Sequence, residues 1–404
     1  MKNGKRVFSA LLIACLLALA AAGCGGNSGG SSGGSSGESQ PANQDQAKTD
    51  APSEGEVTYK FAFMAPLTGD AAQYGLSMEK SAKLRVEMVN NAGGINGGKI
   101  VVDYFDDKND ATEAVNIANK IIADDSYLGV CGPFGSTVAM AVAPIFEKAG
   151  ITMFSPTASH PDLTGMGDYI FRGTRTQTIE TGEYVRFMYD TLNARKVGML
   201  YAQNDWGLSI KEVFEKDFTA KGGELVIAEP YIVGQTTDFS TLLTKIKAQD
   251  IDTFFFVAQY DDAAKVIKQA HSLDLEATYV GPSNMMTDEF IALLGDEAEG
   301  IFLMTGFVPG NTEPAYVEAN DAYKAMFNGE EIDQYGMGAY DTIAMFADAC
   351  AEVGADRAAI KDWLYGMVEW EGSSGLYTMT ETGDPLKPCY PMIIKDGKFI
   401  QYQE

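Results

Sequence analysis

Short runs rich in β-branched and aromatic residues alternate with helical segments from Val57 onward, and this alternation constrains the fold more than any other feature of the chain. Because helices separate successive strands, the strands should form parallel sheets covered by helices on both faces. Nine strands are too many for one sheet in a chain of 404 residues. We therefore predict an α/β fold of two doubly wound parallel-sheet lobes. The nine runs read TYKFAFM, IVVDYF, YLGVCG, ITMF, KVGMLY, ELVIAE, DTFFFVA, ATYVG and GIFLMT.

Three of the intervening segments carry the apolar spacing of core-facing helices. Apolar residues recur at three- and four-residue steps in 76–91, 114–122 and 138–148, and the pair Gly93-Gly94 closes the first of these segments. We assign all three stripes to the hydrophobic core.

Composition supports a folded chain and excludes one class of partner. Hydrophobic residues make up 46% and aromatic residues 11%, which is enough to bury the cores of two lobes. The formal net charge of -26 would repel phosphate backbones and anionic lipid headgroups. We expect no nucleic-acid partner.

The first 23 residues have the pattern of a secretory signal peptide. Lys2, Lys5 and Arg6 precede an apolar run that ends in small residues before Cys24. The ending LAAAGC resembles a bacterial lipoprotein signal, in which the cysteine is lipidated after cleavage. We predict export and a lipid anchor on Cys24 at the outer face of the bacterial cytoplasmic membrane, in a periplasmic or extracellular setting.

Residues 24–56 predict a flexible tether between this anchor and the folded part. Residues 25–37 are almost wholly Gly and Ser, and residues 38–56 add polar residues, Pro and Ala. Some 32 residues of this kind would reach on the order of 30 Å.

Cysteine and histidine usage argues against catalysis. Cys131, Cys350 and Cys389 remain after the signal and the anchor, without metal-ligand spacing, so we expect buried thiols; a bridge between Cys350 and Cys389 stays open. His160 and His271 are the only histidines, and no nucleophile with its base or phosphate loop stands out. We predict no enzyme activity, no cofactor and no metal.

Two loops after predicted strands offer hydroxyl groups where a ligand would bind in an open α/β sheet. Gly132 to Thr137 follows one strand and opens a helix, and Ser155 to Ser159 follows the next strand. Free backbone N–H groups and the helix dipole favour a carboxylate at such a helix start. Ser136 is also a candidate N-cap, and the cap and ligand roles are compatible.

A series of motifs follows in order along the chain: PLTG at 66–69, QYG at 73–75, NNAGGING at 90–97, Asp106-Asp107, the 132–136 loop, API at 143–145, AGI at 149–151, the 155–159 loop and DWG at 205–207. In these motifs the chain resembles the extracellular solute-binding proteins of branched-chain amino-acid ABC transporters, which have the type I periplasmic-binding-protein fold. The resemblance runs from about Thr58 to Gln403.

The resemblance implies lobes that are discontinuous in sequence and joined by a three-stranded hinge. Residues 57–174 and 307–373 would form the first lobe, and residues 175–306 and 374–404 the second. The crossings would lie near 173–176, 305–309 and 372–375.

The resemblance also implies a set of ligand-binding residues. Ser136 and Ser159 match hydroxyl residues that bind the α-carboxylate of the ligand. Thr157 and Ala158 would flank the ligand, with the Thr157 carbonyl accepting from its ammonium group. Tyr74 and Trp206 match aromatic walls on the two lobes, although Trp206 could instead serve packing.

One second-lobe position is ambiguous and another departs from the family. Tyr260 resembles a second-lobe tyrosine, and an equally good match places Gln259 there. Ser283 stands where the family supplies an acid for the ligand ammonium, so another acid must serve or the ligand is not an ordinary amino acid. The candidates that we weigh for this acid are Asp205, Asp261 and Asp288.

The function that follows is capture of a small amino acid, with a branched-chain amino acid as first choice, and delivery to the membrane permease of an ABC importer. The alternatives are a binding protein for another small carboxylate or amide, such as an aromatic acid, a keto acid or a urea-type compound, and a ligand-sensing lipoprotein. We expect the protein to be a monomer.

Overall fold

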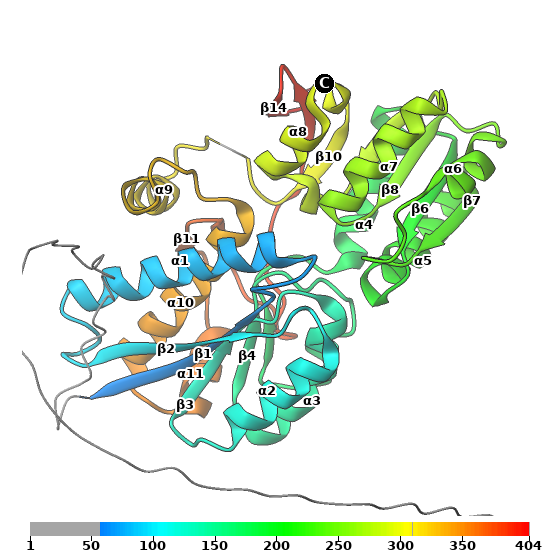
Figure 1. Ribbon diagram of the computed structural model, residues 1–404. Coiled ribbons are helices and arrows are strands. Elements are labelled where there is room, and N and C mark those ends of the chain that lie inside the picture. Colours follow the sequence, from blue (N-terminus) through cyan, green and yellow to red (C-terminus); the bar gives the residue numbers. More distant parts are fainter. Residues whose placement is uncertain (1–56, 309, 404) are drawn as a thin grey trace, which may run out of the picture. The chain divides into compact units, whose positions relative to one another are not determined.

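The computed structural model describes residues 57–308 and 310–403, and its first sheet gathers the N-terminal strands (Figure 1). All its strand pairs are parallel, and the order is β2-β1-β3-β4-β5. The strands are β1 (Thr58–Ala65), β2 (Lys99–Asp106), β3 (Tyr127–Cys131), β4 (Thr152–Ser155) and β5 (Ile170–Arg172).

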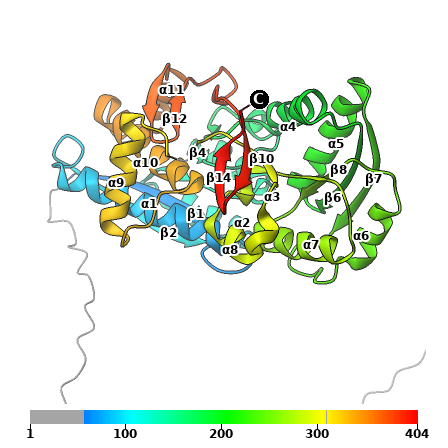
Figure 2. The same cartoon turned by 90° about the horizontal axis from the view of Figure 1, so that it is seen from above.

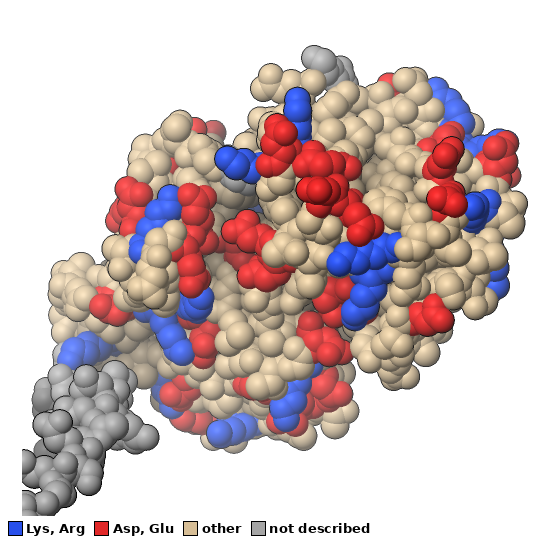
Figure 3. Space-filling model, turned by 45° about the horizontal axis from the view of Figure 1, so that its top comes forward, with Lys and Arg blue, Asp and Glu red and all other residues tan. Residues whose placement is uncertain are grey.

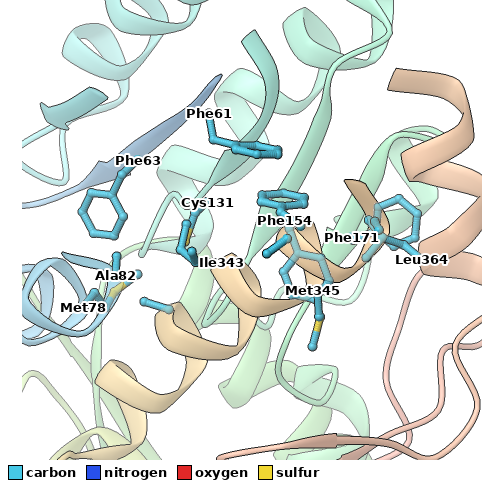
Figure 4. Close-up of a cluster of buried hydrophobic side chains, with 14 of the residues drawn as sticks. Phe61, Phe63, Met78, Ala82, Cys131, Phe154, Phe171, Ile343, Met345 and Leu364 are labelled. Atoms are coloured by element: carbon cyan, nitrogen blue, oxygen red, sulfur yellow. The ribbon is translucent and has the colours of Figure 1, made fainter. Parts of the chain in front are cut away.

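Helices cover both faces of this sheet because side chains alternate along each strand. Phe61 and Phe63 of β1 point to the face covered by α1, α10 and α11, and Figure 4 shows both rings among side chains of these helices. Ala62 and Met64 point to the opposite face, where α2 and α3 pack. The covering helices are α1 (Ala72–Asn91), α2 (Ala111–Ile122), α3 (Ser136–Ala149), α10 (Gln334–Val353) and α11 (Arg357–Tyr365).

The second sheet has the order β14-β13-β10-β9-β8-β6-β7. Its first five strands in the chain pair in parallel, and β13 and β14 add an antiparallel edge. The strands are β6 (Lys196–Ala202), β7 (Glu224–Tyr231), β8 (Thr253–Val257), β9 (Thr278–Gly281), β10 (Phe302–Thr305), β13 (Tyr390–Lys395) and β14 (Lys398–Gln401).

Helices again cover both faces of the second sheet. Residues of α4 and α5 pack on one face, and residues of α6, α7 and α8 pack on the other; Figure 2 shows α5 and α7 on opposite sides of β6 and β8. These helices are α4 (Gln177–Arg186), α5 (Asp205–Ala220), α6 (Ser240–Lys247), α7 (Tyr260–Ser272) and α8 (Asp288–Leu294), and the short segments nearby are a π-helical turn η2 (Phe187–Thr191) and 3-10 turns η3 (Ser283–Met285) and η4 (Gly295–Ala298).

The remaining elements belong with the first sheet. The hairpin of β11 (Trp370–Gly372) and β12 (Gly375–Tyr377) sends Tyr377 into the core beneath α10, and the 3-10 turn η1 (Thr164–Met166) lies before β5. Helix α9 (Pro314–Met326) contacts α1. The chain therefore passes from the first sheet to the second after β5, back after β10, and over again before β13.

The third crossing lies later than the predicted 372–375. The turn between Gly372 and Gly375 is the tip of the β11–β12 hairpin, and buried Asp341 accepts hydrogen bonds from Ser373 and Ser374 there. Gly383 still accepts from Arg172 of β5, and β13 begins at Tyr390. The lobe boundary at 373 was wrong because a Gly-Ser-Ser-Gly turn looks the same in a hairpin as in a linker.

The nine predicted strands all form, and the predicted α/β fold of two parallel-sheet lobes is confirmed. Strand β5, which has three residues, was not predicted. Cys131, Cys350 and Cys389 are free thiols, with Cys350 in the first core and Cys389 against the second, so the open disulfide does not form.

The signal peptide, Cys24 and the tether fall in residues 1–56, outside the described part of the chain. Within the described part, no helix is long and apolar enough to cross a membrane. Figure 3 shows carboxylate side chains spread over one face of the molecule together with fewer basic ones, in keeping with the formal charge of -26.

Candidate functional site

One cavity collects loops that follow strands of both sheets and segments that connect them. It lies at the carboxyl ends of the parallel strands, where ligands bind in open α/β folds. Its lining residues that carry polar side chains are Asn109, Ser136, Thr137, Thr157, Ser159, Thr174, Arg175, Gln177, Glu180, Asn204, Gln259, Ser283, Asn284, Gln334, Ser374 and Lys387, and its aromatic ones are Phe134, Trp206, Phe307, Tyr335 and Tyr377.

Four hydroxyl residues of the first lobe form what we call the hydroxyl cluster: Ser136, Thr137, Thr157 and Ser159. Thr157 donates its hydroxyl to the carbonyl of Phe134 (2.7 Å), and Ser159 donates to Oε1 of Gln177 (2.7 Å). Both predicted loops therefore reach the cavity together. The first turn of α3, with its unpaired backbone N–H groups, begins at Ser136.

Ser136 is not the N-cap of α3. The N-cap is Gly135, which has no side chain to cap with, and Ser136 is the first helical residue. The Ser136 hydroxyl instead accepts from the backbone N–H of His160 (3.3 Å). Its side chain is 4% exposed and lines the cavity, so it remains close enough to a bound ligand to interact with it.

Two predicted first-lobe residues do not line the cavity. Ala158 is buried in the first lobe, where its N–H donates to Ser155 (3.0 Å) and its carbonyl accepts from Arg172 (3.2 Å). Tyr74 lies behind the cavity and stacks on Phe134, which does line it.

The Tyr74 hydroxyl instead ties α1 to the second lobe. It accepts from the backbone N–H of Tyr260 (3.1 Å) and donates to the carbonyl of Asn284 (3.2 Å). The rings of Phe134 and Tyr335, which line the cavity, pack against the ring of Tyr74.

On the second lobe, Trp206, Ser283 and Gln259 line the cavity. Gln259 lines the cavity and Tyr260 does not, because α7 begins at Tyr260 and turns its ring toward Tyr74. The Gln259 side chain accepts from Asn284 (3.4 Å) at its Oε1 atom.

The acid that lies next to Ser283 at the cavity is Glu180, in the first turn of α4. Glu180 is the one carboxylate among the described residues that line the cavity, and Ser283 donates its hydroxyl to it (3.3 Å). Burial raises the pKa of Glu180 above its usual range, and Arg175 opposes the shift. A buried carboxylate of this kind is suited to pair with a ligand cation.

The three acids proposed for this role from the sequence all lie elsewhere. Asp205 is an exposed residue at the start of α5, Asp261 forms an ion pair with Lys265 (3.3 Å), and Asp288 lines a different cavity. These candidates follow second-lobe strands, whereas Glu180 lies in the first turn of α4, just after the first crossing.

Two cations join Glu180 in what we call the charged cluster: Arg175, Glu180 and Lys387. Arg175 Nη2 lies 3.9 Å from Glu180 Oε1, and Arg175 Nη1 donates to the carbonyl of Pro388 (2.5 Å). Burial lowers the pKa of Lys387 to about 7, Asp341 opposes this shift and Arg175 adds to it. None of the three residues was predicted from the sequence. The one available signal was a charge within a predicted crossing, which applies to Arg175 in 173–176 but not to Glu180 or Lys387.

Three buried polar atoms of cavity-lining residues have no hydrogen-bond partner among the described residues: Nε of Arg175, Oδ1 of Asn284 and the hydroxyl of Tyr335. An unsatisfied buried polar atom costs about 1–3 kcal/mol, so a cluster of them at one cavity indicates a polar ligand. The described residues include no group of three side chains able to hold a metal ion.

A family model described as "Periplasmic binding protein" matches residues 58–398, which is most of the chain. The chain belongs to the periplasmic binding protein family. Members of this family are solute-binding proteins, and the cavity described above is where this periplasmic binding protein has the chemistry to hold a small polar solute.

Relatives and solved structures agree with this assignment. The chain is 28% identical over 341 residues to Leu/Ile/Val-binding protein homolog 3 of Brucella melitensis, covering 83% of this chain and 91% of that protein. It is 27% identical to the leucine-, isoleucine-, valine-, threonine- and alanine-binding protein of Pseudomonas aeruginosa, and the match covers 81% of this chain and 87% of that protein.

Among solved structures, the branched-chain amino acid transporter substrate-binding protein LivJ of Streptococcus pneumoniae, in complex with isoleucine, superposes with a TM-score of 0.78 at 28% identity, covering 86% of this chain and all of that one. The expected resemblance to branched-chain amino-acid binding proteins is confirmed.

Proposed function

We propose that this periplasmic binding protein captures a small α-amino acid in the cavity and delivers it to the permease of an ABC importer. The observation that carries the proposal is the presence of Glu180 and the hydroxyl cluster in one cavity. An α-amino acid has one carboxylate, which the hydroxyl cluster could bind, and one ammonium group, which Glu180 could pair with. Leucine, isoleucine and valine are the first ligands to test, because they appear in the names of the relatives.

The hydroxyl cluster would hold the α-carboxylate. Ser136 and Ser159 have hydroxyls at the cavity, and the first turn of α3 adds backbone N–H groups and the positive end of the helix dipole. The Thr157 carbonyl is a further acceptor for the ammonium group, beside Glu180. Trp206 and Phe134 would contact the apolar part of the ligand.

Calorimetry of leucine beside its keto acid, 4-methyl-2-oxopentanoate, tests whether the ammonium group is required. If Glu180 pairs with it, the keto acid should bind at least about a hundredfold more weakly, since an unpaired buried charge costs several kcal/mol. Equal or tighter binding of the keto acid would instead support the alternative, a receptor for carboxylates without an amino group.

Two further parts of the proposal concern turnover and oligomeric state. We propose that the protein releases its ligand unchanged and acts as a monomer. Mass spectrometry of each ligand after incubation with pure protein tests the first part, and light scattering with and without ligand tests the second.

Export and anchoring complete the proposal, with Cys24 as the lipidated residue and residues 25–56 as the tether. Cys24→Ser should move the protein from washed membranes to the soluble fraction while ligand affinity stays the same, because the anchor and the cavity are separate parts of the chain. Retention of the variant in washed membranes would contradict the lipid anchor.

A further inference from the structure

The charges around the cavity do not balance for an aliphatic amino acid. Arg175, Glu180 and Lys387 are the described lining residues with acidic or basic side chains, so the lining offers two cationic groups and one acid. A zwitterion such as leucine brings no net charge and leaves this excess in place. The donors of Arg175 and Lys387 that face the cavity without a carboxylate partner favour a ligand with one additional negative charge.

Lys387 is held at the cavity by neutral groups. Its ammonium donates to the hydroxyl of Ser374 (2.6 Å) and lies 3.6 Å from the ring centroid of Tyr377. Among the described residues no carboxylate forms an ion pair with it. The side chain therefore has ammonium hydrogens left for a ligand.

The groups that hold Lys387 are themselves fixed by Asp341. The Asp341 carboxylate accepts from the Ser374 hydroxyl (2.6 Å) and from the Tyr377 hydroxyl (3.3 Å). Asp341 does not line the cavity, and it is 1% exposed. Its negative charge stabilises the ammonium of Lys387 from the side that faces away from the cavity. On the side that faces the cavity, the ammonium has no acid beside it.

Arg175 is the second cation with unused donors. Its Nε atom is buried and has no hydrogen-bond partner among the described residues, and its 3.9 Å separation from Glu180 is longer than a hydrogen bond. The whole residue is 3% exposed. Arg175 and Lys387 lie on the first and third crossings, which the bond from Arg175 to Pro388 (2.5 Å) joins.

We propose that Arg175 and Lys387 form an anion subsite for a carboxylate in the side chain of the ligand, so that the protein binds acidic amino acids in preference to their neutral amides. The inference rests on the proposed function and narrows it to the class of amino acid. The α-carboxylate would occupy the hydroxyl cluster, the ammonium group would face Glu180, and the side-chain carboxylate would face the two cations.

Comparison of each acid with its own amide isolates the charge. L-Glutamate should bind at least about tenfold more tightly than L-glutamine, and L-aspartate than L-asparagine, in calorimetry at about pH 6, because both pairs have nearly the same size. Lys387→Met should remove this preference, so that each acid and its amide bind the variant with affinities within about threefold of one another. The matched control is Lys395→Met, at an exposed lysine on β13 outside the cavity.

Proton uptake gives a second readout that a purely structural role of Lys387 would not produce. The groups that face Lys387 are Asp341, Arg175 and Tyr377, and in the free protein burial lowers its pKa to about 7. A bound carboxylate favours the charged form, so glutamate should bind with uptake of up to about one proton at about pH 8 and much less at about pH 6. The heat of binding in buffers of different ionisation enthalpy measures this uptake, and Lys387→Met should abolish it.

The outcomes separate this inference from the proposed function. Leucine or glutamine binding as tightly as glutamate, with Lys387→Met without effect, would overturn the anion subsite and leave amino-acid capture intact. Failure of acidic, amidic and aliphatic amino acids alike to bind would overturn both. Tight binding of glutarate, which has two carboxylates and no amino group, together with weak binding of glutamate would support the subsite and contradict the role of Glu180.

Discussion

The two polar clusters of the cavity differ in where they come from. The hydroxyl cluster lies on loops that follow β3 and β4, where parallel sheets generally bind ligands. The charged cluster comes from the first and third crossings and from the start of α4. In the proposed binding mode, loops at strand ends thus supply neutral groups for the α-carboxylate. The start of α4 supplies an acid for the ammonium group, and the crossings supply the two cations for a side-chain carboxylate.

The two clusters also differ in how their side chains are held. Members of the hydroxyl cluster bond to neutral partners close by, as Thr157 does to Phe134. Members of the charged cluster sit near one another without close ion pairs, and Arg175 keeps an unpartnered Nε atom. Changes in the charged cluster should therefore have larger effects on binding than changes in the hydroxyl cluster.

The largest effect is expected for Glu180→Gln. Loss of the carboxylate should weaken amino-acid binding by about 3 kcal/mol, or roughly a hundredfold, since the ammonium group would be buried without a counter-ion. Calorimetry measures the loss. The change in melting temperature should be small, because the glutamine carbonyl can still accept from Ser283.

Glu183→Gln is the control, because Glu183 lies on the same helix and pairs with Arg186 outside the cavity. Binding of the keto acid 4-methyl-2-oxopentanoate to the same variants shows whether the effect depends on the ammonium group. A ligand with a carboxylate and no ammonium group should bind Glu180→Gln at least as well as the unchanged protein, since the variant leaves Arg175 without its acid. If Glu180→Gln weakened the binding of leucine and of the keto acid equally, Glu180 would act on the structure of the cavity and not on the ammonium group.

Sequence reasoning found one cluster and missed the other for a physical reason. The hydroxyl cluster follows strands whose apolar runs are evident, so the order of residues alone was enough to place Ser136, Thr157 and Ser159 on one edge of a sheet. Glu180 lies in the first turn of a helix whose start carries no ligand motif, and Lys387 precedes β13 in a stretch of the chain that was assigned only approximately. Which charges meet in the cavity depends on how the first crossing, the start of α4 and the third crossing come together.

Sequence periodicity could not predict the contacts of Tyr74. Its position on α1 and its side of the helix could be read from the stripe that includes Met78. Its partners, Tyr260 and Asn284, come from the other lobe, and no pattern within α1 indicates them. The resemblance to the family alone assigned Tyr74 to the ligand wall.

A smaller effect is expected for Ser136→Ala. Removal of a hydrogen bond to a charged carboxylate should cost about 1.5–3 kcal/mol, which is roughly ten- to a hundredfold in affinity. Stability should change little, because Gly135 is the N-cap and the Ser136 hydroxyl only accepts a long bond from His160 (3.3 Å). Paired calorimetry and thermal unfolding separate the two quantities.

Ser126→Ala serves as the control, at an exposed serine away from the cavity. A large drop in melting temperature without a change in affinity would show that Ser136 supports the loop and does not contact the ligand. If Ser136→Ala lost more affinity than Glu180→Gln, the hydroxyl cluster would contribute more to binding than the charged cluster, contrary to our expectation.

The smallest effect concerns neighbouring residues that the sequence could not distinguish. Gln259 lines the cavity and Tyr260 starts α7 outside it, although the chain could be matched to the family at either position. Gln259→Ala should cost about 0.5–1.5 kcal/mol, or roughly two- to tenfold in affinity, as expected for one neutral hydrogen bond. Tyr260→Phe should leave affinity within about twofold, because the bond from Tyr260 to Tyr74 uses the backbone N–H, which the substitution keeps.

Calorimetry of both variants with the same ligand decides between the two positions. If Tyr260→Phe were the more damaging change, the phenol would reach the ligand, and the cavity would have to rearrange around α7 when a ligand binds.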